Sequence, residues 1–140
     1  MPVGPYRLPD LGGRTVLVVD DLLEDRSIVA SMLELAGAGV FEATCGEEAK
    51  TTIPHLRPDV VVTELALPDA TGLELARWIR QSDQASLRAT VLVALTRWAR
   101  EYSCHAARAA GFDGYFTKPP TTDDLVMGLA ALLRAPRKPV

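Results

Sequence analysis

The sequence has only two cysteines, Cys45 and Cys104, and only two histidines, His55 and His105. Structural zinc sites need cysteines or histidines at close spacing, and disulfide-rich domains need several cysteines. Neither cysteine has a companion at metal-type spacing, and neither histidine has companion ligands. We therefore expect plain thiols at both cysteines and surface positions for both histidines, without a zinc site or a disulfide framework.

A membrane-spanning run and a secretion signal are also lacking. No apolar stretch approaches the length that crosses a bilayer, and Met1–Arg14 has prolines and glycines in place of a basic start followed by an apolar run. The net charge is −3, whereas nucleic-acid binding needs clustered Lys and Arg. We expect a cytoplasmic protein in which this domain binds neither nucleic acid nor a membrane.

The chain length of 140 residues suits one domain with one substantial core. Its proline- and glycine-containing start predicts a flexible N-terminal arm over residues 1–13, followed by the domain over residues 14–134. Pro136 and Pro139 lie in the short remainder. Residues 135–140 are therefore expected to form a C-terminal tail or the stub of a linker.

Apolar patterning predicts five strands that alternate with five helices. The strands are expected at Thr15–Val19, Val40–Thr44, Val60–Thr63, Thr90–Leu95 and Asp113–Thr117. The helices are expected from Glu24 to about Ala36, at Glu47–Leu56, Leu73–Gln81 and Arg100–Ala110, and after the capping residues Thr121 and Thr122. Such alternation predicts an α/β fold with a doubly wound parallel sheet, helices on both faces and right-handed crossovers.

Four of the predicted strands stop at a polar residue. Asp20 and Asp21 follow the first strand, Glu64 follows the third, Thr96 the fourth and Lys118 the fifth. The carboxyl ends of parallel strands lie along one edge of a sheet, and ligands bind just outside that edge. We therefore expect these side chains to share one cleft.

A glycine-rich phosphate loop is missing after the first strand. The residues at that place are Asp20-Asp21-Leu22-Leu23, which cannot wrap a phosphate with close backbone amides as glycines do. A small α/β enzyme or nucleotide binder that reuses the acidic edge is therefore a weaker interpretation than a domain without such chemistry.

The order, spacing and type of these residues resemble the receiver domains of bacterial two-component response regulators, over roughly Arg14 to Arg134. The resemblance implies a flavodoxin-like (βα)5 three-layer sandwich whose five-stranded sheet has the order 2-1-3-4-5. It also implies a role in phosphorelay signal transduction. Asp20 and Asp21 match the acidic pair that holds Mg²⁺ in the family, and hard cations do prefer oxygen ligands. Asp21 could instead simply cap the first helix.

The segment Glu64–Gly72 looks like the phosphoacceptor loop of the family, with Pro68 and Gly72 at matching positions. Only the acid differs, because the family has an aspartate that attacks a phosphoryl group from a phosphohistidine. The resemblance implies that Glu64 is the phosphoacceptor equivalent and that the main chain of Ala66 completes the metal ligands. It also implies that the domain is not an enzyme, since the phosphoacceptor aspartate is absent.

Three further residues match switch and phosphate-binding positions of the family. Thr96 corresponds to the hydroxyl that binds a phosphoryl oxygen, Lys118 to the ammonium that neutralises its charge, and Tyr115 to the aromatic switch residue. The Lys118-Pro119 bond is usually cis in the family, and cis is readily accessible only before proline. Taken singly, these residues are equally ordinary: a helix cap, a solvated lysine and a half-buried strand residue.

Glu64 is expected to make phosphotransfer slow or absent, since one extra methylene misplaces the attacking oxygen. We expect its carboxylate to reach towards Lys118 or Thr96 and partly imitate the phosphorylated state. Two interpretations stay open. The chain is an atypical receiver that acts as an interaction module, or a conventional receiver that carries an introduced, phosphomimetic Asp-to-Glu substitution.

Arg97 is a second departure, because the family usually has a small residue after the threonine. The guanidinium could cover the pocket and pair with Glu64, Asp20 or Asp21, which would weaken or abolish Mg²⁺ binding; it could equally point to solvent. Whether Mg²⁺ is bound therefore stays open.

Expected partners are a histidine kinase or phosphotransfer protein, and a protein output target or a second copy. The family's output surface corresponds to helix Arg100–Ala110, strand Asp113–Thr117 and the final helix. Trp98 and Tyr102, four residues apart near the start of that first helix, are either an exposed aromatic anchor or core residues.

Overall fold

The computed structural model describes residues 7–135 and contains one five-stranded parallel sheet. Its strands are β1 (Thr15–Val19), β2 (Gly39–Ala43), β3 (Val60–Thr63), β4 (Val91–Thr96) and β5 (Gly114–Thr117). They are hydrogen-bonded in the order β2-β1-β3-β4-β5, and every pair is parallel. This order and direction confirm the predicted fold class.

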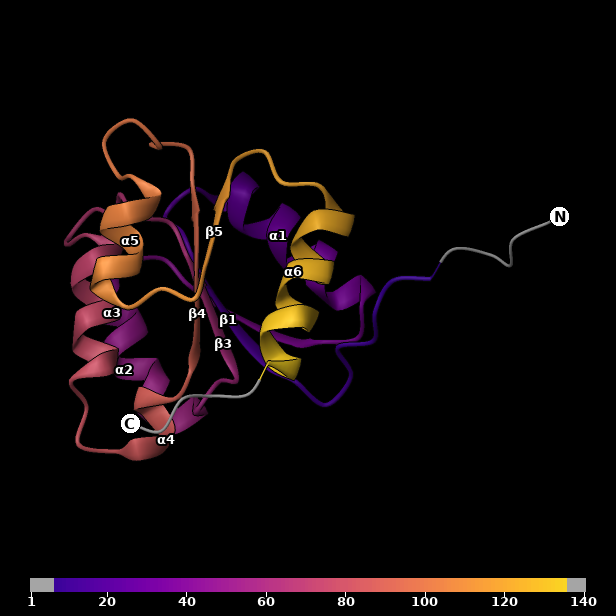
Figure 1. The fold of residues 1–140 in the computed structure, drawn as a ribbon, viewed down its shortest axis with the longest axis horizontal. Coiled ribbons are helices and arrows are strands. Elements are labelled where there is room, and N and C mark those ends of the chain that lie inside the picture. The colour runs from indigo at the N-terminus through magenta and orange to yellow at the C-terminus, as the bar shows by residue number, and fades with distance from the viewer. Residues whose placement is uncertain (1–6, 136–140) are drawn as a thin grey trace, which may run out of the picture.

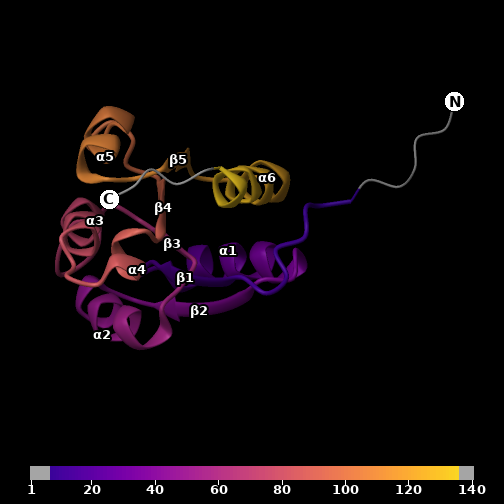
Figure 2. The ribbon, with the colours of Figure 1, turned by 60° about the horizontal axis from the view of Figure 1, so that its bottom comes forward.

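Helices cover both faces of the sheet and make a three-layer sandwich (Figures 1 and 2). The helices are α1 (Leu23–Leu35), α2 (Gly46–Leu56), α3 (Gly72–Arg80), α4 (Ala85–Arg88), α5 (Cys104–Ala110) and α6 (Thr122–Arg134). α1 and α6 lie on one face, whereas α2, α3 and α5 lie on the other. No helix in the described part of the chain is long and apolar enough to cross a membrane.

The core has two halves, one on each face of the sheet. Val18, Leu33 and Leu129 lie in the half beneath α1 and α6, and Leu17 and Leu75 lie in the half beneath α2, α3 and α5. All residues of β3 and β4 are buried because both of their faces are covered. A central sheet held this rigidly fixes where each strand ends.

The expected cap is present at α6 but not at α1, where the N-cap residue is Leu22 without a side-chain cap, so Asp21 does not cap this helix. Thr121 accepts a hydrogen bond from the amide of Asp124 and caps α6, and Thr71 caps α3 in the same way. Gly111 ends α5 with a φ of 114°, which favours glycine.

Two helical expectations are wrong. The helix expected at Arg100–Ala110 begins only at Cys104, because Ser103 caps it by accepting from the amide of Ala106. Trp98 and Tyr102 therefore lie in the preceding loop rather than on a helix. The single turn of α4 was not expected, since four residues carry too little periodicity to predict a helix.

The structure describes only part of the predicted N-terminal arm and C-terminal tail. Residues 1–6 of the predicted arm and residues 136–140 of the predicted tail lie outside the described residues, and for them the expectation stays a prediction. Within the predicted arm, Leu11 is only 2% exposed, and its amide donates to the carbonyl of Ala36 over 2.8 Å. Leu11 therefore belongs to the packed domain.

Candidate functional site

The carboxyl ends of β1, β3 and β5 bring Asp20, Glu64 and Lys118 together. Lys118 Nζ lies 2.6 Å from Oδ2 of Asp20 and 3.2 Å from Oε1 of Glu64. Their side chains are 6%, 5% and 3% exposed for Lys118, Asp20 and Glu64. An ammonium thus lies between two buried carboxylates at the edge where the sequence placed a shared cleft.

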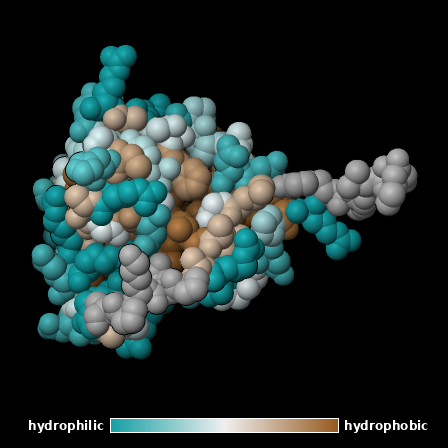
Figure 3. Space-filling model, viewed as in Figure 1, coloured by the Kyte–Doolittle hydropathy of each residue, from teal (hydrophilic) through white to brown (hydrophobic). Residues whose placement is uncertain are grey.

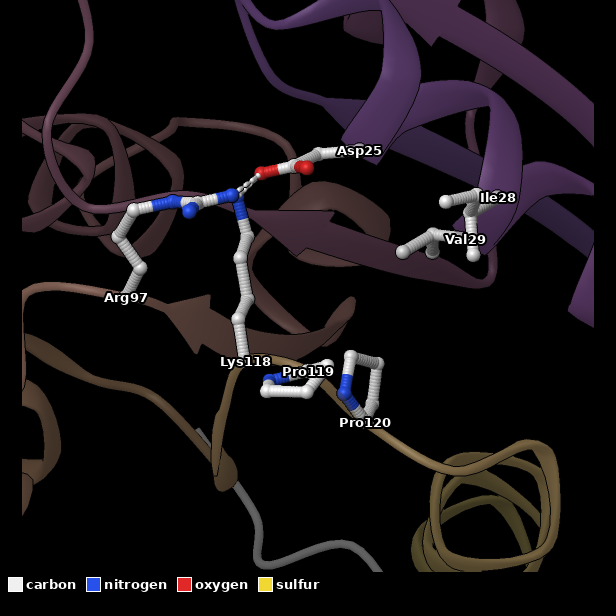
Figure 4. Close-up of a pocket in the computed structure, with 7 residues that line it drawn as sticks. All are labelled: Asp25, Ile28, Val29, Arg97, Lys118, Pro119 and Pro120. Atoms are coloured by element: carbon white, nitrogen blue, oxygen red, sulfur yellow. Dashed lines mark hydrogen bonds and ion pairs between the residues drawn. The ribbon is translucent and has the colours of Figure 1, made fainter.

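Asp25, in the first turn of α1, is a member of this site that sequence reasoning missed. Its Oδ2 accepts from Lys118 Nζ over 2.9 Å and also from the guanidinium of Arg97. The available signal was its place in the sequence, since Asp25 lies in the first turn of the helix that follows the acidic pair at the end of β1. Asp25 links α1 to the ends of β4 and β5 (Figure 4).

Arg97 lies at this edge, but the expected partners of its guanidinium are wrong. The guanidinium pairs with Asp25 and not with Glu64, Asp20 or Asp21. Only its backbone amide touches one of those three, since it donates to Oε1 of Glu64 over 3.2 Å. The length of the side chain explains this. Because the backbone of Arg97 already faces Glu64, the arginine side chain extends past Glu64 and reaches Asp25 on α1.

Protein donors hold both oxygens of Glu64. Oε2 accepts from the amides of Leu65 and Ala66, over 2.6 and 3.4 Å. Oε1 faces Lys118 and the amide of Arg97. The carboxylate therefore folds back onto its own loop.

The other predicted site residues lie at the edge but not in this ion cluster. The side chain of Asp21 is exposed. Thr96 is buried, and its Oγ1 accepts from the amide of Trp98 over 3.0 Å. The hydroxyl of Tyr115 donates to the carbonyl of Tyr102 over 2.7 Å.

The ion pairs shift the pKa values of the groups that form them. Burial disfavours the charged ammonium of Lys118, but hydrogen bonds to Asp20 and Asp25 outweigh it, so the pKa of Lys118 is raised. The hydrogen bond from Lys118, helped by Arg97, lowers the pKa of Asp25 against the effect of burial. Asp25 in turn raises the pKa of Arg97. All three groups are held in their charged forms.

A family model described as a response regulator receiver domain matches residues 16–130. The chain belongs to this family. The phosphate regulon transcriptional regulatory protein PhoB of Pseudomonas aeruginosa is 34% identical over 122 residues, which cover 87% of this chain and 52% of PhoB. The chain thus spans about half the length of PhoB and of several other curated relatives it matches.

Solved structures place this receiver domain in the same fold. A response regulator from Chloroflexus aurantiacus has a TM-score of 0.81 at 28% identity, over 87% of this chain and 98% of that one. The receiver domain of sensor histidine kinase PA1611 from Pseudomonas aeruginosa, with magnesium coordinated in its active-site cleft, has a TM-score of 0.79 at 25% identity. That likeness covers 89% of this chain and 100% of the other.

The loop after β3 of this receiver domain is tied down at several points. Asp69 accepts from the amides of Gly46 and Glu47 at the start of α2, each over 2.8 Å. The amide of Gly72 donates to the carbonyl of Leu65. A Cβ atom on Gly72 would lie 2.6 Å from the carbonyl oxygen of Glu64, so only glycine fits there. These contacts fix the backbone that carries Glu64.

The Lys118-Pro119 peptide bond of this receiver domain is cis, as the resemblance implied. The cis bond lies where β5 turns towards α6, directly beside the ion cluster.

The donor set of this receiver domain, as arranged, does not fit Mg²⁺. Oδ2 of Asp20 is bonded to Lys118 and Oδ1 to the amide of Leu22, while both oxygens of Glu64 face protein donors. Within residues 7–135, no three acidic, histidine or cysteine side chains converge on a point where a metal could bind. The ammonium of Lys118 pairs with the two carboxylates, Asp20 and Glu64, whose negative charge a metal ion would otherwise neutralise.

Proposed function

We propose that this receiver domain is an atypical one: phosphotransfer is impaired by Glu64, and the domain acts in two-component signalling as a protein-interaction module. The observation that carries the proposal is the carboxylate of Glu64, which is held by protein donors on both oxygens. A nucleophile must present a free oxygen in line with the phosphorus and the leaving group. Glu64 presents none.

The same contacts support a partial imitation of the phosphorylated state. Lys118 faces the carboxylate of Glu64 as it would face a phosphoryl oxygen. The imitation stops there, because Thr96 accepts from the amide of Trp98 rather than meeting Glu64. A phosphoryl group also carries more charge and more acceptor oxygens than a carboxylate.

The alternative is a conventional receiver with an introduced Asp-to-Glu substitution. One observation favours it: Asp20, Thr96 and Lys118 all lie at the same edge of the sheet. An aspartate at position 64, directly after β3, would complete the family's set of site residues. Both candidates share the family role in signalling. They differ in whether Glu64 is the natural residue or replaces a natural aspartate.

Labelling with acetyl phosphate or a phosphohistidine donor tests the proposal. Wild type should incorporate little phosphate, and any labelling of Glu64→Asp should be sensitive to hydroxylamine, as an acyl phosphate is. Glu64→Gln is the matched control for labelling elsewhere. Efficient hydroxylamine-sensitive labelling of wild type at Glu64 would overturn the proposal.

We propose weak or absent Mg²⁺ binding as part of this function. Asp20, Asp21, Glu64 and the carbonyl of Ala66 would be the ligands, and Mg²⁺ would supply charge neutralisation for phosphotransfer. Binding requires Lys118 to leave Asp20. A titration should give no saturable site at micromolar Mg²⁺, whereas micromolar binding would contradict this part of the proposal.

The proposed partners are a histidine kinase or phosphotransfer protein, and an output protein or second copy that contacts α5, β5 and α6. Figure 3 shows hydrophobic residues in the middle of that face, between α5 and α6. Tyr102 and Tyr115 are half-buried, while Arg100 is exposed and Trp98 is 46% exposed. Trp98 therefore suits the proposed aromatic anchor. We place the protein in the cytoplasm, with no nucleic-acid or membrane contact by this domain.

A further inference from the structure

Two cationic side chains of this site donate hydrogen bonds to the same carboxylate oxygen. Lys118 Nζ and the guanidinium of Arg97 both donate to Oδ2 of Asp25 (Figure 4). Two converging cations are the arrangement that binds a phosphate or another tetrahedral oxyanion. Asp25 supplies the anion from within the chain.

Space for a free anion lies directly beside these groups. A cavity of about 270 Å³ is lined by Asp25, Arg97 and Lys118, and by Ile28, Val29, Pro119 and Pro120. The apolar residues form the far wall, and the charged residues lie together at the other end. An ion entering this cavity would reach both cations without displacing the core.

The two cations differ in freedom. The side chain of Lys118 is 6% exposed and is also held by Asp20 and Glu64. The side chain of Arg97 is 46% exposed and lies in the loop after β4. Arg97 can therefore follow an incoming anion once Asp25 no longer holds it.

We propose that Lys118 and Arg97 form a binding site for a small tetrahedral oxyanion, and that Asp25 closes the site by occupying it as a tethered competitor. The inference rests on the proposed function only in assigning Lys118 to phosphoryl recognition. Removing the charge of Asp25 opens the site, because the two cations then lose a shared partner and one negative charge leaves the cluster.

The test is a titration with inorganic phosphate, in the presence of a chelator and without any phosphodonor. Binding is monitored by the NMR chemical shifts of the Arg97 and Lys118 amides. Asp25→Asn should bind phosphate at least tenfold more tightly than wild type. Adding Arg97→Ala to that variant should remove the gain. Glu24→Gln is the matched control, since Glu24 is an exposed acid in the same helical turn and should leave phosphate affinity at the wild-type value.

Asp25→Ser provides a second variant and should show the same gain, so the test stands if one variant folds poorly. Equal phosphate affinity in wild type, Asp25→Asn and Asp25→Ser would overturn the inference, as would an equal gain in Glu24→Gln, which would indicate bulk charge alone.

A second arm separates a free ion from a phosphoryl group on residue 64. Labelling of Glu64→Asp by acetyl phosphate should become at least tenfold faster when Asp25→Asn is added, if the site also serves a bound phosphoryl group. An unchanged rate would restrict the site to free anions. A Glu64→Asp protein that never labels bears on the proposed function, whereas the phosphate titration still decides the inference.

Discussion

The Nζ atom of Lys118 lies 3.2 Å from Oε1 of Glu64, so the end of β5 is joined to the end of β3 across β4. Asp20 completes the group from β1. Since all three side chains are nearly inaccessible to water, no one of them can lose its partner without leaving a buried charge.

Replacing Lys118 should therefore destabilise the fold strongly. We expect Lys118→Met to lower the free energy of unfolding by about 3–5 kcal/mol, because Asp20 and Glu64 are left without a cation. Urea denaturation measures the loss. Lys50→Met is the control: Lys50 lies over the ring of Trp78, and losing this contact should cost about 1 kcal/mol or less. Equal losses in the two variants would show that the cluster contributes little.

Gly72→Ala should disturb the loop that carries Glu64. The new Cβ would lie 2.6 Å from the Glu64 carbonyl oxygen, and overpacking of this kind costs about 1–3 kcal/mol. Gly39→Ala is the matched control, since its Cβ would meet only the Arg14 carbonyl oxygen at 3.7 Å. Thermal or urea unfolding of both variants checks the difference. A Gly72→Ala protein as stable as Gly39→Ala would mean that the loop moves freely.

Asp69 should make the free energy of unfolding depend on pH in the acidic range, below the ordinary pKa of an aspartate. Hydrogen bonds from the amides of Glu47 and Gly46 lower the pKa of Asp69 from its ordinary value of 3.8. A lowered pKa in the folded state contributes stability above the unfolded pKa, and this contribution is lost as the pH falls through the folded value. Wild type should thus exceed Asp69→Ala in unfolding free energy at pH 6, and the gap should narrow below pH 3.8. A gap that stayed constant down to pH 2 would contradict this role of the carboxylate.

Arg80 should be a stabilising residue at the opposite edge of the sheet from the ion cluster. Its guanidinium donates to the carbonyls of Gly111, Arg88 and Thr90 and to Asp113. A lysine cannot reproduce this planar set of donors, so Arg80→Lys should lower the unfolding free energy by about 2–4 kcal/mol. Arg77→Lys, on the exposed side of α3, should change it by about 0.5 kcal/mol or less. Hydrogen exchange near β4 would locate the loss.

The sequence predicted the parts of this molecule that depend on backbone repetition. Strand ends were predictable because buried β-branched runs stop where the polar residues start, as at Val19 and Thr63, and parallel pairing then aligns those ends. Side-chain partners were not predictable in the same way. Arg97 can reach several acids from the end of β4, and only the position of α1 decides that Asp25 is the one.

The loop between β4 and α5 was the least predictable segment. The alanine-rich run that follows it and the four-residue spacing of Trp98 and Tyr102 favour a helix that starts earlier. Ser103 caps the helix further along instead, and the carbonyl of Tyr102 accepts a hydrogen bond from Tyr115. Two specific hydrogen bonds thus outweigh the local helix propensity of this segment.

Those bonds give the loop a property of its own. The hydroxyl oxygen of Thr96 holds the amide of Trp98 at one end, and the hydroxyl of Tyr115 holds the carbonyl of Tyr102 at the other. If Thr96 turned away to meet an anion, the first tether would open, and the aromatic ring of Trp98, displayed on the outside, would be the first group to shift. The intrinsic fluorescence of that indole offers a direct optical report of events at the sheet edge.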